Sequence, residues 1–368
     1  MRSEQEVQRR VRKYINRLKK MNVFQTARGM KNSVLDIDND SIIIQKKRSE
    51  KGSYKIAKRA IERSALFVFR VRTITKKELE AFTNYTSAFF GLLEAIFEGI
   101  ARIYKLRELR LSLLGTRVFF SGFSHRAPSD FKLAQETQAE YILLSYYYIR
   151  QDKTNAWRRL ADQYGFRGKI LLDSGAYSLY NLSKFKEIKD EPTIHEYIEF
   201  VKENRDYFCM WASFDKIGND NESRENYETM IASDVEPMPI IGIDSPLSEF
   251  QYVIEQYDPA VVGIGGILGI KNRNARRARL KEIFTAFPNT NFHGLGVADS
   301  NLVAFNWFSC DTTSWLIAPR KYLKVQTIHG QKECPKSWSL FDRIAFGVKE
   351  LRSLEHWYQT HSPTELII

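Results

Sequence analysis

The chain is poor in the residues that build disulfide frameworks and metal sites. Its three cysteines, Cys209, Cys310 and Cys334, are far apart and odd in number. That spacing matches neither a disulfide framework nor a Cys-x-x-Cys zinc pattern, and structural thiols in a reducing compartment are the simpler interpretation. Histidine is also scarce, with six residues in the chain. We therefore expect no metal site and no other cofactor.

Long apolar runs are missing as well. The sequence has no stretch of about 18 uncharged apolar residues, which a membrane-spanning helix would need. The first ten residues, MRSEQEVQRR, lack the apolar core of a signal peptide. We expect a protein of the cytoplasm without a membrane partner. A hydrophobic content of 43% with 13% aromatic residues is ordinary for a folded protein and argues against disorder.

Acidic residues are outnumbered by basic ones only in the first third of the chain. Residues 1–110 hold 26 Lys and Arg against 12 Asp and Glu, whereas the remaining residues hold 30 against 32. The whole positive excess behind the net charge of +12 therefore lies in this region. Such a field attracts polyanions, of which nucleic acid is the commonest. A basic surface that only solubilises the protein is the alternative.

Residues 4–20 predict an amphipathic helix. Val7, Val11, Ile15 and Leu18 follow one another at spacings of four, four and three, which places them in one apolar stripe among basic residues. A strand-like run follows at 41–45. Thr75-Lys-Lys-Glu78 then reads as a capping box that opens a helix continuing to Phe97. We expect residues 1–112 to form a small, basic, mostly helical domain.

This domain is the predicted nucleic-acid-binding region. A basic amphipathic helix can also lie on an anionic membrane, but Lys and Arg continue well beyond the first helix, which favours nucleic acid. The candidate contacts in this region are Arg9, Arg10, Lys46, Lys47, Arg48, Lys58 and Arg59.

From about residue 112 the pattern changes to short apolar runs that alternate with helix-like stretches. Thr193 and Pro246 mark helix starts in two of the intervals. Apolar strands joined by helices imply a parallel sheet covered on both faces. Eight such units predict that residues 113–368 form a (β/α)₈ TIM barrel, with a doubly wound sheet as the weaker alternative. The eight runs are 116–121, 140–145, 169–172, 207–214, 237–243, 260–264, 291–295 and 307–310.

Carboxylates follow four of these runs. Asp173, Asp215, Asp244 and Asp311 end or follow the third, fourth, fifth and eighth strands. In a barrel, catalytic residues lie at the carboxyl ends of the strands, so we expect these four at one mouth. A single Asp after a strand is often only a helix N-cap, and for Asp244 the two interpretations are evenly balanced.

The glycines after the sixth and seventh strands do not form a dinucleotide-binding motif. The third glycine of G-x-G-x-x-G is replaced by Leu268 after Gly263 and by Asp299 after Gly294. The chemistry left at this mouth is that of carboxylates. Paired carboxylates suit displacement at an anomeric carbon, where one attacks to form a glycosyl intermediate and another handles protons. The residues thus predict glycosidic-bond chemistry on a polyanionic substrate.

Five segments together resemble the tRNA-guanine transglycosylase superfamily. Asp173-Ser-Gly-Ala-Tyr177 is similar to its Asp-Ser-Gly-Gly-(Phe/Tyr) motif, and Ser213-Phe-Asp215 to its Phe-Asp motif. Ile264-Gly-Gly-Ile267 resembles its Ile-Gly-Gly-Leu loop, and Gly294-Leu-Gly-Val297 its last glycine-containing strand. Phe308-Ser-Cys-Asp311-Thr-Thr-Ser resembles the segment of its nucleophilic aspartate, offset by about one residue. The five motifs occur in the family's order and span roughly residues 115–320.

The resemblance implies a role for each carboxylate. Asp311 would attack C1′ of a nucleotide and expel guanine. Asp173 would contact the base or ribose and assist proton transfer. Asp215 would accept hydrogen bonds from the N1–H and 2-amino edge of guanine. The target nucleotide would have to be flipped out of any duplex.

The same resemblance implies a substrate-binding set around these carboxylates. The backbone of Gly265, Gly266 and Ile267 would read the opposite edge of the base, and Tyr177 would stack on the ring, although ordinary packing also explains that tyrosine. Ser174, within the first motif, and Asp244 at the same mouth complete the set.

The sequence departs from the tRNA enzymes where they hold zinc and tRNA. Their Cys-x-Cys-x-x-Cys and distant His are absent, Ser178 replaces a motif glutamine, and Gly242-Ile-Asp244 stands near their Gln-Gly-Gly. The Asn that they carry after the second strand falls here within Ser145–Tyr148, and their bacterial members lack the basic N-terminal region. The chain is more similar to the relatives that insert 7-deazaguanines into DNA.

We therefore expect a DNA-guanine transglycosylase that inserts 7-cyano-7-deazaguanine or a close derivative. The alternatives are the same exchange on tRNA, and a non-catalytic nucleic-acid-binding barrel. Arg320 and Lys321, after the eighth strand, are candidate phosphate contacts, with solvated loop residues as the simpler interpretation. The protein partners left open are an ATPase that opens the duplex and a second copy of this chain.

Overall fold

A computed structural model describes residues 4–27, 29–45, 52–105, 107–122, 124–185 and 190–359. The chain divides into two compact units, with the boundary between Leu114 and Gly115. This boundary lies two residues beyond the expected one. Among the described residues, the structure has no helix whose length and apolar content would let it cross a membrane.

The first unit begins with the predicted amphipathic helix, α1 (Glu4–Met21). Its apolar stripe is buried, with Val7 and Leu18 at 0% exposure, because it packs against the helices α2 (Lys58–Val71) and α4 (Thr86–Ile96). The basic residues of α1 are exposed, except for Arg10, which is half-buried. Helix α1 is therefore a structural element of this unit that presents a cationic surface.

The expectation of a mostly helical first unit is not confirmed, because its described part also contains two antiparallel sheets. One has the order β1-β2-β3-β4 and the other β5-β7-β6. Only the strand at 41–45 was expected. The strand β2 alternates buried and exposed residues, but its sequence, KNSVLDI, has few apolar residues to reveal that alternation. The strands are β1 (Val23–Gln25), β2 (Lys31–Ile37), β3 (Ser41–Gln45), β4 (Ser53–Ala57), β5 (Thr73–Thr75), β6 (Ala101–Lys105) and β7 (Leu109–Leu113).

The helix expected from Thr75 to Phe97 is also wrong in its length. The capping box of Thr75 and Glu78 is present, but it opens only the short helix α3 (Lys76–Leu79). A turn then precedes α4, and in it the backbone N–H of Tyr85 donates to the Thr83 hydroxyl, 3.0 Å away. Such local side-chain bonds compete with helix continuation.

The second unit is built on an eight-stranded parallel sheet of order β11-β10-β9-β8-β15-β14-β13-β12. Each of the eight predicted runs contains or overlaps one of these strands. They are β8 (Arg117–Phe120), β9 (Ile142–Ser145), β10 (Ile170–Asp173), β11 (Phe208–Trp211), β12 (Ile240–Gly242), β13 (Val262–Gly265), β14 (Phe292–Gly294) and β15 (Ser309–Thr312).

The sheet curls so that its two end strands approach each other. Ala212, just after β11, forms a parallel bridge with Met238, just before β12. The N–H of Ser213 donates to the Met238 carbonyl and the N–H of Met238 to the Trp211 carbonyl, each at 2.8 Å. The arrangement is compatible with a TIM-like α/β fold.

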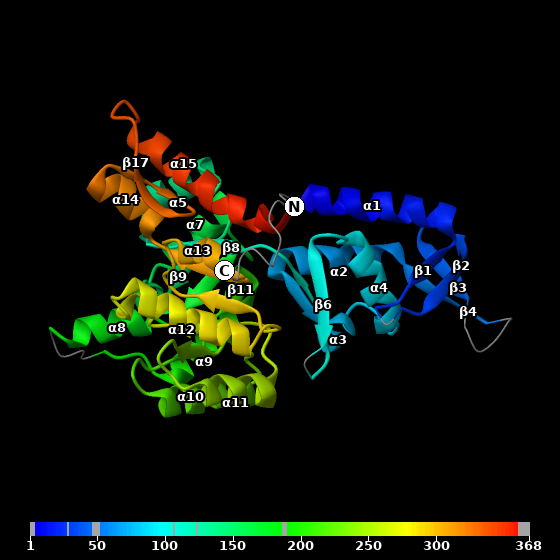
Figure 1. The fold of residues 1–368 in the computed structure, drawn as a ribbon, viewed down its shortest axis with the longest axis horizontal. Helices are drawn as coiled ribbons and strands as arrows, with labels where there is room; N and C mark the ends of the chain where they lie inside the picture. Colours follow the sequence, from blue (N-terminus) through cyan, green and yellow to red (C-terminus); the bar gives the residue numbers. More distant parts are fainter. Residues whose placement is uncertain are drawn as a thin grey trace. The chain divides into compact units, whose positions relative to one another are not determined.

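Helices cover the outside of this sheet (Figure 1). The starts expected at Thr193 and at Pro246 are confirmed, since these residues are the N-caps of α9 and α11. A second apolar cluster, which includes Phe119, Tyr141 and Leu171, lies apart from the core beneath the helices. The principal helices are α5 (Pro128–Glu136), α7 (Ala156–Tyr164), α8 (Ala176–Ser183), α9 (Ile194–Asn204), α10 (Asp220–Ala232), α11 (Leu247–Tyr257), α12 (Arg273–Ala286), α14 (Ser314–Tyr322) and α15 (Leu340–Ser353).

Candidate functional site

Three of the four expected aspartates come together at the carboxyl end of the sheet. Asp173 is the last residue of β10, Asp215 follows β11, and Asp311 lies in β15. Burial, together with the negative charges of Asp215 and Asp311, raises the pKa of Asp173 to about 7. A carboxyl group with such a pKa can hold a proton near neutral pH, whereas an exposed one cannot.

Two hydrogen bonds fix the carboxylate of Asp311. Its Oδ1 accepts from the N–H of Gly296 at 2.8 Å, and its Oδ2 accepts from the Ser121 hydroxyl at 3.1 Å. Gly296 has a φ of +73°, in the left-handed region that glycine adopts without strain, so its backbone can turn that N–H toward the strand. Asp311 is 8% exposed. Asp311 is thus held in one orientation at an almost fully buried position.

Asp173 is held by the turn that follows its strand. Its Oδ2 accepts from the N–H of Gly175 at 2.9 Å, and the hydroxyl of Ser145, its register partner on β9, favours its charged form. Gly175 has a φ of +91°, and a Cβ there would lie 2.4 Å from the Cβ of Tyr147. Glycine is therefore required at this position both by conformation and by space.

Asp215 is tied to the same turn. Its Oδ1 accepts from the Ser174 hydroxyl at 2.6 Å. Burial raises the pKa of Asp215, and the bond from Ser174 opposes that shift. Ser174 is buried, at 1% exposure. The Asp-Ser-Gly motif thus supplies both the first carboxylate and the hydroxyl that orients the second.

The glycine turn after β13 lies beside the loop that holds Asp311. Gly265 ends β13, and Gly266, with a φ of +71°, caps the short 3₁₀ helix that begins at Ile267. A Cβ on Gly296 would lie 3.3 Å from the side chain of Leu268, so the two loops are in contact. The backbone expected to read a base is therefore next to the expected nucleophile.

The other two predicted substrate contacts are on the surface. Tyr177 is 67% exposed on α8, a helix that buries none of its residues. Asp244 is exposed in the turn after β12, with Oδ1 close to Gly242. No hydrogen bond or ion pair among the described residues joins it to the other three aspartates. Pro246 rather than Asp244 is the N-cap of α11, so the structure does not give Asp244 the capping role either.

The predicted nucleic-acid contacts of the first unit differ in their surroundings. Arg9 and Arg59 are exposed. Arg10 is half-buried, 3.4 Å from the Ile96 carbonyl and 3.8 Å from Glu6, and Lys58 donates to the carbonyls of Asp38 and Asn39. Lys46, Lys47 and Arg48 lie outside the described residues. Arg9 and Arg59 are therefore better placed to bind phosphate than Arg10 and Lys58.

The two basic candidates of the second unit differ in the same way. Arg320 forms an ion pair with Asp130 at 3.0 Å, whereas Lys321 is exposed near the end of α14.

Sequence reasoning missed Ser121, Ser145 and His293. Ser121 directly follows β8 and Ser145 ends β9, so applying the strand-end rule to hydroxyls as well as carboxylates would have found them. His293, in β14, is buried at 0% exposure, with Nε2 3.7 Å from Oδ1 of Asp311. Its position directly before Gly294, the glycine that ends the strand, gave no signal by itself.

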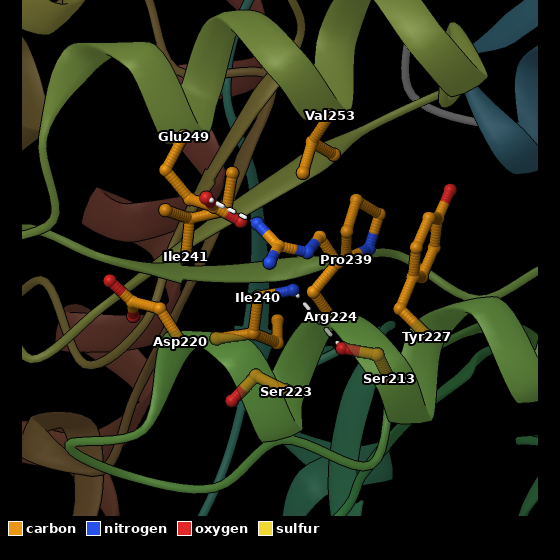
Figure 2. Close-up of a pocket in the computed structure, with 10 residues that line it drawn as sticks. All are labelled: Ser213, Asp220, Ser223, Arg224, Tyr227, Pro239, Ile240, Ile241, Glu249 and Val253. Atoms are coloured by element: carbon orange, nitrogen blue, oxygen red, sulfur yellow. Dashed lines mark hydrogen bonds and ion pairs between the residues drawn. The ribbon is translucent and has the colours of Figure 1, made fainter.

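A separate hollow lies between α10 and α11 (Figure 2). Arg224 reaches across it to Glu249, 2.9 Å away, and the Ser213 hydroxyl accepts from the N–H of Ile240 at its floor. The cation in this hollow is already neutralised, and Asp173, Asp215 and Asp311 do not line it. The hollow therefore belongs to the packing of two helices on the sheet.

Among the described residues, the structure contains no group of three or more His, Cys, Asp or Glu placed to hold a metal ion. No protein-family model matches the chain, and neither does any curated protein. Among solved structures, the chain is similar to a protein from Aquifex aeolicus VF5 described only as a structural study. The two are 11% identical, with a TM-score of 0.38, over 65% of this chain and 93% of the other.

Proposed function

We propose that the chain is a DNA-guanine transglycosylase that exchanges guanine for a 7-deazaguanine, such as 7-cyano-7-deazaguanine. One observation carries the proposal: Asp173, Asp215 and Asp311, from three different strand ends, lie close enough for the charges of the other two to raise the pKa of Asp173. We take the curled sheet to be a complete (β/α)₈ barrel, in which this end is the catalytic mouth.

In the proposed reaction Asp311 is the nucleophile. One of its oxygens attacks C1′ of the nucleotide as the C1′–N9 bond to guanine breaks, which gives an aspartyl-glycosyl ester and a free base. N9 of the incoming base then attacks C1′, and the carboxylate of Asp311 leaves. The exchange is redox-neutral and needs no co-reactant.

Asp173 is the proposed proton carrier. A carboxyl group with a pKa of about 7 is divided between its two forms near neutral pH, as a group that both donates and accepts a proton must be. Protonated, it gives its proton to the departing guanine. Charged, it accepts the N9 proton of the incoming 7-deazaguanine. One group thus serves both half-reactions.

The remaining residues of the site would recognise the base. Asp215, held by Ser174, offers acceptor oxygens to the N1–H and 2-amino groups of guanine. The turn at Gly265, Gly266 and Ile267 offers backbone groups to the opposite edge. Tyr177 offers an exposed ring for stacking, which contributes about 1–3 kcal/mol per base in single-stranded complexes.

The first unit would hold the DNA backbone. On α1, the exposed residues Arg9, Lys13 and Lys20 fall at helical spacings of four and seven and so share one face. The apolar stripe of the same helix is in the core, which leaves it unable to insert into a lipid surface. Phosphate binding by the cationic face is the role that suits this arrangement.

The test of the proposed function is base exchange with labelled 7-cyano-7-deazaguanine on duplex DNA, single-stranded DNA and tRNA. We expect label in DNA and a covalent protein–DNA adduct on denaturing gels. Asp311→Asn should lose both but still bind DNA. The control is Asp206→Asn, which removes an exposed carboxylate before β11, at the other end of the sheet. Label in tRNA alone would favour the tRNA alternative, and salt-dependent binding with neither label nor adduct would favour the non-catalytic one.

A second test concerns the cationic face of α1. We expect the triple change Arg9→Gln, Lys13→Gln and Lys20→Gln to weaken duplex binding and to flatten its dependence on salt. Each lost phosphate contact lowers the slope of log K against log salt by about 0.9. The measurement is fluorescence anisotropy of a labelled duplex at several salt concentrations.

A matched control for this test removes the same charge elsewhere. Arg273, Lys281 and Lys349 are exposed on α12 and α15 of the second unit, and changing all three to Gln should leave the slope unchanged. Equal slopes for the α1 triple variant and the unmodified protein would remove α1 from the DNA-binding surface.

A further inference from the structure

His293 stands out among the buried polar residues of the second unit. It is 0% exposed in the middle of β14, and its register partner on β15 is Ser309. Nδ1 of His293 lies 2.8 Å from Oγ of Ser309. Asp311 is two residues beyond Ser309 on the same strand, so both side chains project from the same face of the sheet. The three residues form a row toward the carboxyl end.

The second ring nitrogen of His293 points at the proposed nucleophile. Nε2 lies 3.7 Å from Oδ1 of Asp311, and in the part of the chain that the structure describes it makes no hydrogen bond. A buried polar atom left without a partner costs about 1–3 kcal/mol. If the residue at this position served only to fill the core, an apolar side chain would be more stable because it has no polar atom to leave without a partner. The ring also meets Phe119 edge-on at 6.0 Å, which restricts its rotation.

We propose that His293 is a positioning residue for Asp311, an inference that rests on the proposed function. The Ser309 hydroxyl donates to Nδ1, which fixes the neutral tautomer with hydrogen on Nε2. Nε2–H then donates to Oδ1 of Asp311 when the substrate is bound. Oδ1 would thus have two donors, His293 and Gly296, whereas among the described residues Oδ2 accepts a hydrogen bond only from Ser121. Oδ2 keeps more of its electron density and is the oxygen that attacks C1′.

Two amide variants test the direction of this contact. The amide nitrogen of Gln can take the place of Nε2, whereas the shorter Asn reaches only the place of Nδ1. We expect His293→Asn to lower kcat for base exchange by about 10- to 100-fold with little change in KM, the loss typical of a hydrogen bond to a charged group. His293→Gln should recover most of that loss. Equal activity of the two variants at equal thermal stability would overturn the proposal.

Nitrogen NMR of protein labelled at histidine gives a readout that needs no catalysis. With six histidines in the chain, the His293 signals can be assigned by their loss in His293→Gln. We expect a protonated Nε2 and a bare Nδ1 and, in the complex with duplex DNA, a shift of the Nε2 signal in Asp311→Asn. A bare Nε2, or an Nε2 signal that Asp311→Asn leaves in place in that complex, would refute the positioning role.

The two readouts separate this inference from the proposed function. The expected NMR result in a protein that exchanges no base would contradict the transglycosylase and leave the His293–Asp311 contact standing. Normal base exchange with a bare Nε2 would support the transglycosylase and contradict the His293–Asp311 contact. Should both amide variants fail to fold, Ser309→Ala removes the lock on the tautomer alone. It should lower kcat, and an unchanged kcat with an unchanged Nε2 signal would count against the proposal.

Discussion

The two ends of the parallel sheet differ in whether their buried charged groups lie in ion pairs. At the amino end, the buried guanidinium of Arg117 pairs with Glu355 at 3.1 Å and lies over the ring of Tyr141 at 3.6 Å. At the carboxyl end, Asp173 and Asp215 have no ion-pair partner among the described residues, and each is desolvated. One end compensates its charge. The other collects charge of one sign.

This difference indicates which end is built for stability and which for chemistry. A buried ion pair with good geometry keeps each charge satisfied, and removing one partner is costly. Like charges held together in a poorly solvated site disfavour the charged state and lower stability. Such an arrangement persists where the perturbed groups are used, so it identifies the carboxyl end as the candidate site.

The largest expected effect is at the amino end. We expect Arg117→Met to lower the free energy of unfolding by about 3–5 kcal/mol, because it removes the guanidinium that pairs with the partly buried carboxylate of Glu355. Urea unfolding measures the loss. The double variant Arg117→Met with Glu355→Gln should recover part of it, since the partly buried negative charge is gone. If Arg117→Met cost nothing, the two ends would not differ as proposed.

At the carboxyl end we expect a substitution to raise the free energy of unfolding instead of lowering it. The pKa of Asp173 in the folded protein, about 7, lies above its ordinary value of 3.8. The folded state therefore binds more protons than the unfolded one between these values, and stability falls as pH rises from about 4 to about 7. Asp173→Asn removes that cost and should stabilise the protein at pH 8 by up to about 4 kcal/mol.

Unfolding of Asp173→Asn across pH 4 to 8 checks this prediction. The gain should be largest at pH 8 and should disappear near pH 4, where Asp173 is protonated in both states. Asp206→Asn, the exposed control at the other end, should follow the unmodified protein at every pH. A gain that is independent of pH would mean that the amide stabilises by another route than removal of a charge.

The sequence predicted the sheet well and the first unit less well, for a physical reason. Strands buried on both faces are continuous apolar runs, and each of the eight was found. The strands of the first unit are short and partly exposed, as in β2, and polar residues hide their alternation. The turn after β10 was predicted correctly. Asp173, which ends the strand, and the glycine of the turn are two residues apart in one short segment.

Contacts between distant segments were beyond sequence reasoning. Ser121 and Asp311 are 190 residues apart, and their hydrogen bond follows only from the neighbouring positions of β8 and β15 in the sheet. His293 and Ser309 meet by register for the same reason. The burial that raises the pKa of Asp173 is likewise a property of the assembled end of the sheet, where Asp215 and Asp311 arrive from other strands.

The smallest expected change in stability comes from a second, more exposed ion pair at the amino end. It tests whether the large loss in Arg117→Met comes from the burial of its charge or from ion pairing itself. Arg352 also pairs with a carboxylate there, Glu140, at 3.0 Å, but both side chains are 26% exposed. Water screens such a pair, so we expect Arg352→Gln to cost at most about 1 kcal/mol in urea unfolding. A loss as large as that of Arg117→Met would show that ion pairing matters at this end whatever its depth. A small loss would mean that only the buried charges account for the difference in stability between the two ends.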